Sequence, residues 1–167
     1  MNDVLTVLGF SALWAGFGVV SGLVAALVPN RFFERDTHLT RIRRWESNGR
    51  LYDRTLRVRR WKDSLPEAGG LFRSGGSKAT LGGLSLASLD RIITETRRAE
   101  WVHWANAAFG VTFFAWTEPI VGAVMTTFGV VAHLPFVVVQ RYNRGRALSL
   151  RSTILDRLGR AAVPQTS

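Results

Sequence analysis

The chain is 167 residues long, enough for one domain, and contains no cysteine. The lack of cysteine excludes disulfide bonds, thiolate zinc sites and a cysteine nucleophile. The formal net charge is +10, most of it from arginine, which is typical of proteins that bind nucleic acid or an anionic membrane surface. Where the charges lie along the chain decides between these two classes.

The first segment, residues 4–29, contains no ionisable residue. It is longer than the roughly 20 residues that cross a bilayer as a helix. A signal peptide is the alternative, but no Lys or Arg precedes the segment and no A-x-A cleavage pattern closes it. The sequence therefore favours a retained transmembrane helix that ends at Pro29.

The polar segment that follows, residues 31–100, begins with a short periodic stretch. Residues 37–48 place Leu39, Ile42 and Trp45 three apart among arginines. This spacing predicts a short amphipathic helix in the membrane interface.

Two further stretches of the polar segment are less regular. Residues 51–62 are basic and aromatic, and their pattern fits a strand or a helix. Residues 66–83 are rich in glycine and predict a flexible cytoplasmic loop. No nucleotide-phosphate motif is present in that loop.

Two more uncharged stretches, residues 101–117 and 119–140, are separated by a few residues and predict a helical hairpin. The first is short for a span, so either its helix begins in the polar residues before Trp101 or the hairpin is partly re-entrant. Ser88 is the predicted N-cap of that helix. Pro135 is predicted to kink the last span.

The charges predict the topology of these spans. All 22 Lys and Arg residues lie within residues 31–100 or after Gln140. The positive-inside rule then places the N-terminus outside, and loop 31–100 and tail 141–167 in the cytoplasm. Residues 1–167 are thus predicted to form a single all-α membrane domain with about three transmembrane helices. The basic excess indicates membrane lipids as partners and no nucleic acid, since no nucleic-acid-binding motif accompanies it.

Ionisable residues at the mouth of the second uncharged stretch are the first candidate site. Residues 95–104 read ETRRAEWVHW, and ionisable groups at a membrane boundary are often functional. Helical spacing places Glu100 and His103 on one face. His103 is the candidate general base and Glu100 the group that orients it. The structural alternative is an interfacial histidine bonded to backbone or lipid.

Other charged residues of the same segment have a plain structural interpretation. Glu95 and Arg98, three apart, are spaced for a helix ion pair. Arg97 is predicted to snorkel toward lipid headgroups.

The second and third candidate sites flank the hairpin in sequence. The stretch QRYNRGR offers arginines that can clamp phosphate or carboxylate, interleaved with neutral hydrogen-bonding groups. Its candidate substrate-binding residues are Gln140, Arg141, Tyr142, Asn143, Arg144 and Arg146. The stretch RRWKDSLP contributes Trp61 and Lys62, either to a binding surface or to membrane docking. The three histidines are scattered and no GxSxG elbow is present, so neither a metal site nor a serine nucleophile is predicted.

Three motifs together resemble a known family. RVRRWKDSLP, IITETRRAEWVHW and LPFVVVQRYNRGR, in that order, are similar to the glycosyl-4,4'-diaponeurosporenoate acyltransferases, over about Arg31 to Leu148. The resemblance implies a small bacterial cell-membrane enzyme. It implies transfer of a fatty acyl group to a sugar hydroxyl of a glycosylated C30 carotenoid, the last step of staphyloxanthin-type carotenoid biosynthesis.

The resemblance also marks residues. On the motif positions of the family fall Trp61, Lys62, Glu95, Arg98, Glu100, His103, Trp104, Gln140, Arg141, Tyr142, Asn143, Arg144 and Arg146. Two positions depart from it: Gly145 stands where proline is frequent, and His133 where asparagine is frequent. These departures leave the transfer class unchanged. They leave the acceptor open between a glycosylated carotenoid and a related glycolipid.

The resulting hypothesis is direct acyl transfer, with no bound cofactor and acyl-CoA as the co-substrate. His103 would deprotonate the sugar hydroxyl, and Arg141, Arg144 and Arg146 would hold a phosphate-bearing donor or stabilise the oxyanion. One alternative is a non-catalytic membrane scaffold of a lipid or pigment assembly. Another is an enzyme that acts on polyprenyl or phospholipid substrates. The sequence leaves the oligomeric state open.

Overall fold

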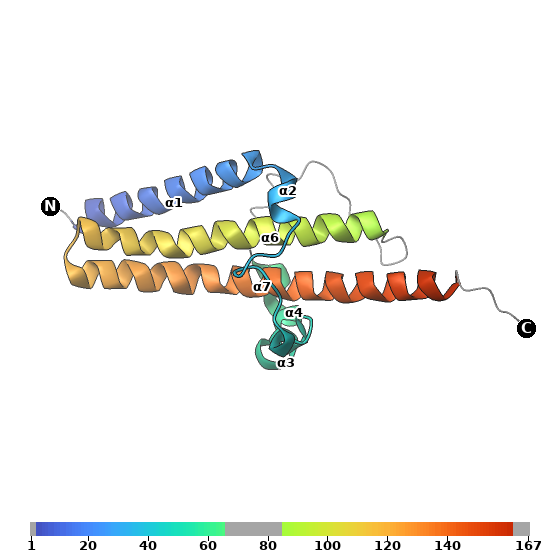
Figure 1. Ribbon diagram of the computed structural model, residues 1–167. Coiled ribbons are helices and arrows are strands. Elements are labelled where there is room, and N and C mark those ends of the chain that lie inside the picture. Colours follow the sequence, from blue (N-terminus) through green and yellow to red (C-terminus); the bar gives the residue numbers. More distant parts are fainter. Residues whose placement is uncertain (1–2, 66–84, 162–167) are drawn as a thin grey trace, which may run out of the picture.

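The computed structural model describes residues 3–65 and 85–161, in which all regular structure is helical. The long helices are α1 (Asp3–Leu27), α6 (Leu86–Phe109) and α7 (Pro119–Ala161). They lie side by side with α6 in the middle (Figure 1). The short elements are α2 (Asn30–Phe33), η1 (Arg44–Glu46), α3 (Arg50–Leu56), α4 (Val58–Trp61), η2 (Lys62–Ser64) and η3 (Gly110–Ala115). The predicted all-α class is confirmed for the described residues.

Two helices are long and apolar enough to cross a membrane: α1, over Val4–Leu27, and α7. Both expose large apolar side chains along their length, such as Val4 and Leu27 on α1 and Ile120 on α7. Hydrocarbon chains, unlike water, accept such side chains at no cost. The count of three spans stays a prediction, because the charged first half of α6 makes that helix less apolar than α1 and α7.

Helix α6 begins three residues earlier than predicted. Ser85 is the N-cap, and its hydroxyl accepts a hydrogen bond from the backbone N–H of Ser88 at 3.1 Å. The helix therefore starts in the polar residues before Trp101, which is the first of the two possibilities left open by the sequence. It runs to Phe109 and tightens into η3 before the turn to α7.

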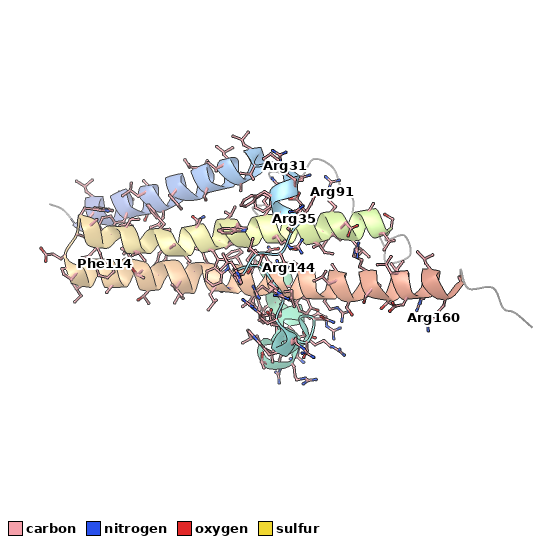
Figure 2. The ribbon with its side chains drawn as sticks, in the orientation of Figure 1. Arg31, Arg35, Arg91, Phe114, Arg144 and Arg160 are labelled. Carbon is pink, nitrogen blue, oxygen red and sulfur yellow. The ribbon has the colours of Figure 1, made fainter. Side chains whose placement is uncertain are left out.

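The predicted hairpin of α6 and α7 is confirmed, and glycines allow its close packing. A Cβ atom at Gly110 would lie 2.6 Å from the carbonyl oxygen of Met125, and one at Gly129 would lie 2.9 Å from that of Ala107. Helix α7 continues through Pro135 without a break. It also continues through most of the tail, to Ala161. Figure 2 places Phe114 near the turn end of the hairpin, Arg144 midway and Arg160 at the far end.

The predicted amphipathic helix at residues 37–48 is wrong. Instead, Thr37 and Thr40 each accept the other's backbone N–H through a side-chain oxygen, and a single 3-10 turn follows at Arg44–Glu46. Threonine side chains compete with helical hydrogen bonds in this way. We call residues 34–46 the strap, because they cross the α6–α7 hairpin near its middle (Figure 1).

The strap leads into α3 and α4, so residues 51–62 are mainly helical rather than a strand. The turn before α3 has positive φ angles at Ser47, Asn48 and Gly49. It rests on α7 at Gly145, where a Cβ atom would overlap the backbone of Asn48. Glycine at position 145 is therefore required by this close contact. The glycine-rich loop predicted at residues 66–83 lies outside the described residues.

Candidate functional site

A buried carboxylate, Glu100 of α6, lies where the charged half of the hairpin meets its apolar half. Its side chain is fully buried. Oε1 accepts hydrogen bonds from Arg141 Nη1 at 2.7 Å and from Trp104 Nε1 at 3.2 Å. Oε2 accepts one from Arg144 Nη2. Both oxygens are thus paired with cationic groups of α7, as the burial of a carboxylate requires.

The side chain of Arg141 joins α6 and α7 to the strap. Nε and Nη2 bond the two carboxylate oxygens of Glu46, at 3.0 and 2.6 Å. The remaining N–H groups reach Glu100 and the backbone carbonyls of Leu39 and Arg41, at 2.7 to 2.9 Å. All five N–H groups of this guanidinium therefore have an acceptor inside the protein.

Glu46 has a further partner in Tyr52, whose hydroxyl donates to Oε2 at 2.7 Å. Burial alone would raise the pKa of Glu46, but hydrogen bonds from Arg141, the Arg43 backbone and Tyr52 lower it below its usual value. Burial and the neighbouring Glu46 carboxylate raise the pKa of Tyr52 to about 12. The glutamate is therefore ionised and the tyrosine protonated at neutral pH.

Arg144 differs from Arg141 because some of its N–H donors have no acceptor. Its side chain is fully buried, and Nη2 bonds Glu100 and the carbonyl of Thr40. Among the described residues, Nε and Nη1 meet no acceptor. We call Glu46, Glu100, Arg141 and Arg144 together the ion-pair cluster.

His103 lies one helical turn deeper into the apolar half, and its partner is another histidine. Its Nδ1 is 3.2 Å from Nδ1 of His133 on α7. The His103 ring stacks on Phe136 at 4.7 Å between centroids, and the His133 ring stacks on Trp14 of α1 at 6.0 Å. We call His103 and His133 the histidine pair. The predicted contact between Glu100 and His103 is absent among the described residues, because both oxygens of Glu100 are occupied by other groups.

Trp61 and Lys62 of the RRWKDSLP motif lie at the end of α4 and the start of η2, and α4 contacts α7. Trp61 donates its indole N–H to the carbonyl of Leu56 at 2.8 Å and packs against an apolar core that includes Tyr142. Lys62 forms an ion pair with the adjacent Asp63 at 2.6 Å. The structure thus brings Trp61 and Tyr142 together and leaves Lys62 half-buried beside Asp63.

The charged residues that precede Glu100 on α6 fasten the N-terminal segment. Arg98 forms the predicted ion pair with Glu95 at 3.5 Å, but its guanidinium also bonds carbonyls at the end of α1, including that of Ala25 at 2.6 Å. The prediction that Arg97 snorkels is wrong, since it is 6% exposed and bonds Asp36 of the strap at 2.7 and 3.0 Å. Buried arginines are retained when every charge finds a partner in this way.

The remaining residues of QRYNRGR face different surroundings. Gln140 and Asn143 are half-buried, and Arg146 is exposed. Arg146 is therefore the arginine of this motif that a soluble ligand can reach without breaking the ion-pair cluster.

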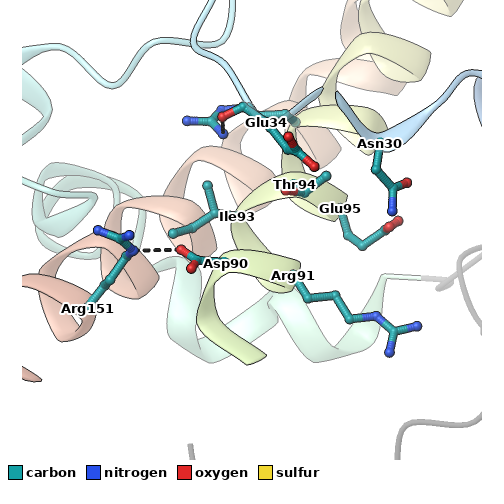
Figure 3. A pocket seen from close by; sticks show the side chains of 9 residues that line it. Asn30, Glu34, Asp90, Arg91, Ile93, Thr94, Glu95 and Arg151 are labelled. Atoms are coloured by element: carbon teal, nitrogen blue, oxygen red, sulfur yellow. Dashed lines mark hydrogen bonds and ion pairs between the residues drawn. The ribbon is translucent and has the colours of Figure 1, made fainter. Parts of the chain in front are cut away.

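A polar pocket of about 550 Å³ opens between α2, α6 and α7. Figure 3 shows Asn30 and Glu34 on one side and the ion pair of Asp90 with Arg151 on the other, at 2.6 Å. Its other lining residues are Arg91, Ile93, Thr94, Glu95 and Arg97. Neither the histidine pair nor Glu100 lines it, so this pocket and the candidate catalytic group are separate features.

Sequence reasoning missed Glu46, Tyr52 and Thr40, and it named His133 only as a departure from the family's pattern. Glu46 was embedded in an arginine-rich stretch, and its partner Arg141 lies 95 residues away. The one available signal was the rarity of a histidine in an apolar span, which applied to His133 as much as to His103.

Comparison with known proteins gives one consistent result. A family model described as glycosyl-4,4'-diaponeurosporenoate acyltransferase matches residues 29–153, a range that contains all three sequence motifs. The protein of that name from Staphylococcus aureus (strain MRSA252) is 27% identical over 132 residues, 79% of each chain. Its namesake from Staphylococcus haemolyticus (strain JCSC1435) is 28% identical over 136 residues, 81% of this chain and 79% of the relative. No solved structure matches this chain at a significant level.

Proposed function

Because the chain belongs to the glycosyl-4,4'-diaponeurosporenoate acyltransferase family, we propose that it moves a fatty acyl group onto a sugar hydroxyl of a glycosylated carotenoid or a related glycolipid. Membership makes it an acyltransferase. The acceptor, the donor and the residues that act are the substance of the proposal. The observation that supports it most is the position of His103, an imidazole inside the apolar hairpin and one turn from the charged boundary.

That position suits a membrane lipid with a sugar headgroup. His103 follows Glu100 by three positions, which is a rise of about 4.5 Å along the helix. A glycolipid whose apolar chain lies among the spans would hold its sugar near this level. An imidazole can accept a hydroxyl proton at neutral pH.

The reaction needs no covalent enzyme intermediate. The hydroxyl oxygen attacks the carbonyl carbon of an acyl thioester such as acyl-CoA while His103 takes the hydroxyl proton. The carbon–sulfur bond then breaks, and the imidazolium returns the proton to the departing thiolate. The chain has no cysteine to form an acyl-enzyme.

The roles of Arg141 and Arg146 follow from whether their N–H groups already have acceptors within the protein. Arg141 has every N–H group engaged, so we assign it to holding the strap on the hairpin rather than to holding the donor. Arg146 is exposed and suits the phosphates of an acyl-CoA, which arginine binds bidentately.

We further propose that the protein crosses the bacterial cell membrane three times, with the second half of α6 and η3 as the middle crossing. An α7 span requires its tightly packed partner in the hairpin to share the membrane. The concentration of basic residues outside the spans supports a cytoplasmic strap and C-terminal half of α7.

The test uses the purified full chain in lipid nanodiscs with a glycosylated carotenoid and radiolabelled acyl-CoA. We expect acylated product from the wild type and a loss of about 100-fold or more in His103→Ala. His38→Ala is the matched control, since His38 is the exposed histidine outside the hairpin. Wild-type product from His103→Ala at normal protein abundance would remove His103 as the base.

Lipid mass spectrometry of cells with and without the gene tests the reaction class. A change confined to acylated glycolipids supports the proposal. A change among polyprenyl or phospholipid species indicates a different transferase. If cells without the gene acylate the same fraction of the glycolipid, and only the location of the glycolipid changes, the protein is a non-catalytic scaffold.

A further inference from the structure

The histidine pair carries an inference that rests on the proposed function and extends it to a second residue. The two Nδ1 atoms are 3.2 Å apart, within hydrogen-bond distance. Two imidazole nitrogens make a hydrogen bond only when one carries the proton and the other offers its lone pair. The two rings are therefore in different protonation forms at Nδ1.

The arrangement decides which nitrogen of His103 can act as a base. If Nδ1 of His103 donates to His133, the lone pair of His103 is on Nε2, on the opposite side of the ring. If His133 donates, Nε2 of His103 carries the hydrogen and cannot accept a proton. Only the first arrangement suits proton abstraction.

Among the described residues, neither Glu100 nor Phe136 can accept the Nδ1 hydrogen of His103. The oxygens of Glu100 are taken by Arg141, Arg144 and Trp104. Phe136 stacks on the face of the His103 ring and has no side-chain polar atom. Stacking on Trp14 restrains the His133 ring in turn, so each imidazole stacks on an aromatic neighbour of its own.

We propose that His133 is a positioning residue for acyl transfer. It accepts the Nδ1 hydrogen of His103, fixes that ring in the Nδ1–H form and leaves Nε2 free to take the proton of the acceptor hydroxyl. The structural alternative is an interhelical hydrogen bond that helps to hold α6 and α7 together without effect on the reaction.

Two variants separate these roles. His133→Phe removes the acceptor and keeps an aromatic ring beside Trp14. His133→Asn keeps a side-chain oxygen that can accept the Nδ1 hydrogen. We expect His133→Phe to lower kcat at least about tenfold with little change in KM for the acceptor, and His133→Asn to restore most of the loss. His38→Asn is the control for exchanging a histidine elsewhere.

A spectroscopic measurement tests the tautomer in the wild-type protein itself, and the variants serve only to assign its signals. The chain has three histidines, so ¹⁵N-histidine labelling of the wild type in detergent gives few ring signals, and His38→Asn and His133→Asn assign them. We expect His103 to show a protonated Nδ1 and an unprotonated Nε2. The opposite tautomer would overturn the proposal.

The outcomes also separate this proposal from the proposed function. If His103→Ala is inactive while His133→Phe turns over at the wild-type rate, His133 has no positioning role and the function stands. If His133→Asn is as impaired as His133→Phe, the acceptor role is overturned. If the wild type acylates no glycolipid, the function fails and the positioning role fails with it.

Discussion

Glu100 of the ion-pair cluster and His103 of the histidine pair lie one helical turn apart on α6, yet the hydrogen-bonding capacity of Glu100 is fully used and that of His103 is not. In the cluster, Glu100 and Arg141 have every side-chain donor or acceptor group engaged. In the histidine pair, each ring uses Nδ1 in the hydrogen bond to the other ring, and Nε2 stays outside that bond. Saturated groups hold a fold together, whereas groups with an open position can meet a substrate. The difference separates stability from chemistry within one short stretch of sequence.

The sharpest test of this separation is Glu100→Gln. Removing one charge of a buried ion pair leaves its partners uncompensated, and we expect a loss of about 3–5 kcal/mol in the free energy of unfolding. His103→Ala should lower the free energy of unfolding by less than half of that amount, while it abolishes the acylated product. Thermal unfolding in detergent, with product measured per folded molecule, checks both. Equal losses of stability in the two variants would contradict the distinction.

Glu95→Gln is the matched control for the charge change. Glu95 lies on the same helix, is about half exposed and pairs with Arg98 at 3.5 Å. Exposed pairs of this kind contribute about 0–1 kcal/mol. A loss as large as that of Glu100→Gln would mean that removal of any carboxylate from α6 is equally harmful.

Gly145→Ala tests how tightly the turn before α3 rests on α7. The added methyl group would overlap the backbone of Asn48, and overpacking of this sort costs about 1–3 kcal/mol. We expect faster proteolysis of the strap and lower thermal stability, but an unchanged rate per folded molecule. Ala substitution at Gly159, which has open space around it, is the control. A change in rate with unchanged stability would place Gly145 in the reaction instead.

The smallest expected effect is the response of the cluster to acid. The pKa of Glu46 is depressed in the folded protein, so its contribution to stability is present above its unfolded pKa and is lost as pH falls through the folded value. The gap in melting temperature between wild type and Glu46→Gln should therefore narrow as pH is lowered below about 4.5. A gap that stays constant from neutral to acidic pH would show that Glu46 acts through its shape alone.

The sequence predicted the parts of the molecule that depend on local pattern. Length without charge identified α1 and the hairpin, and helical spacing placed Glu100 and His103 on neighbouring positions. The strap could not be predicted, because its backbone carbonyls at Leu39 and Arg41 are bonded by Arg141, which is about 100 residues away. Periodicity alone suggested a helix there, and distant side chains decided otherwise.

The sequence singled out Glu100, His103 and the arginines of QRYNRGR, but it did not predict which side chains they contact. Three-residue spacing leaves two side chains about 60° apart around a helix, enough to meet different partners. Glu100 therefore reaches the arginines, while His103 reaches His133. A sequence read one helix at a time does not reveal which neighbour each side chain will meet.

Helix α7 runs unbroken past Pro135 and carries residues of both regions, among them His133 and Arg144, which are eleven residues or about three turns apart. Their angular relation is set by the count of residues between them. Inserting one residue between the two would rotate the C-terminal half of the helix by about 100° against the N-terminal, apolar half. The hairpin could then satisfy the histidines or the arginines, but not both. The number of residues between the two regions is therefore as constrained as their identity.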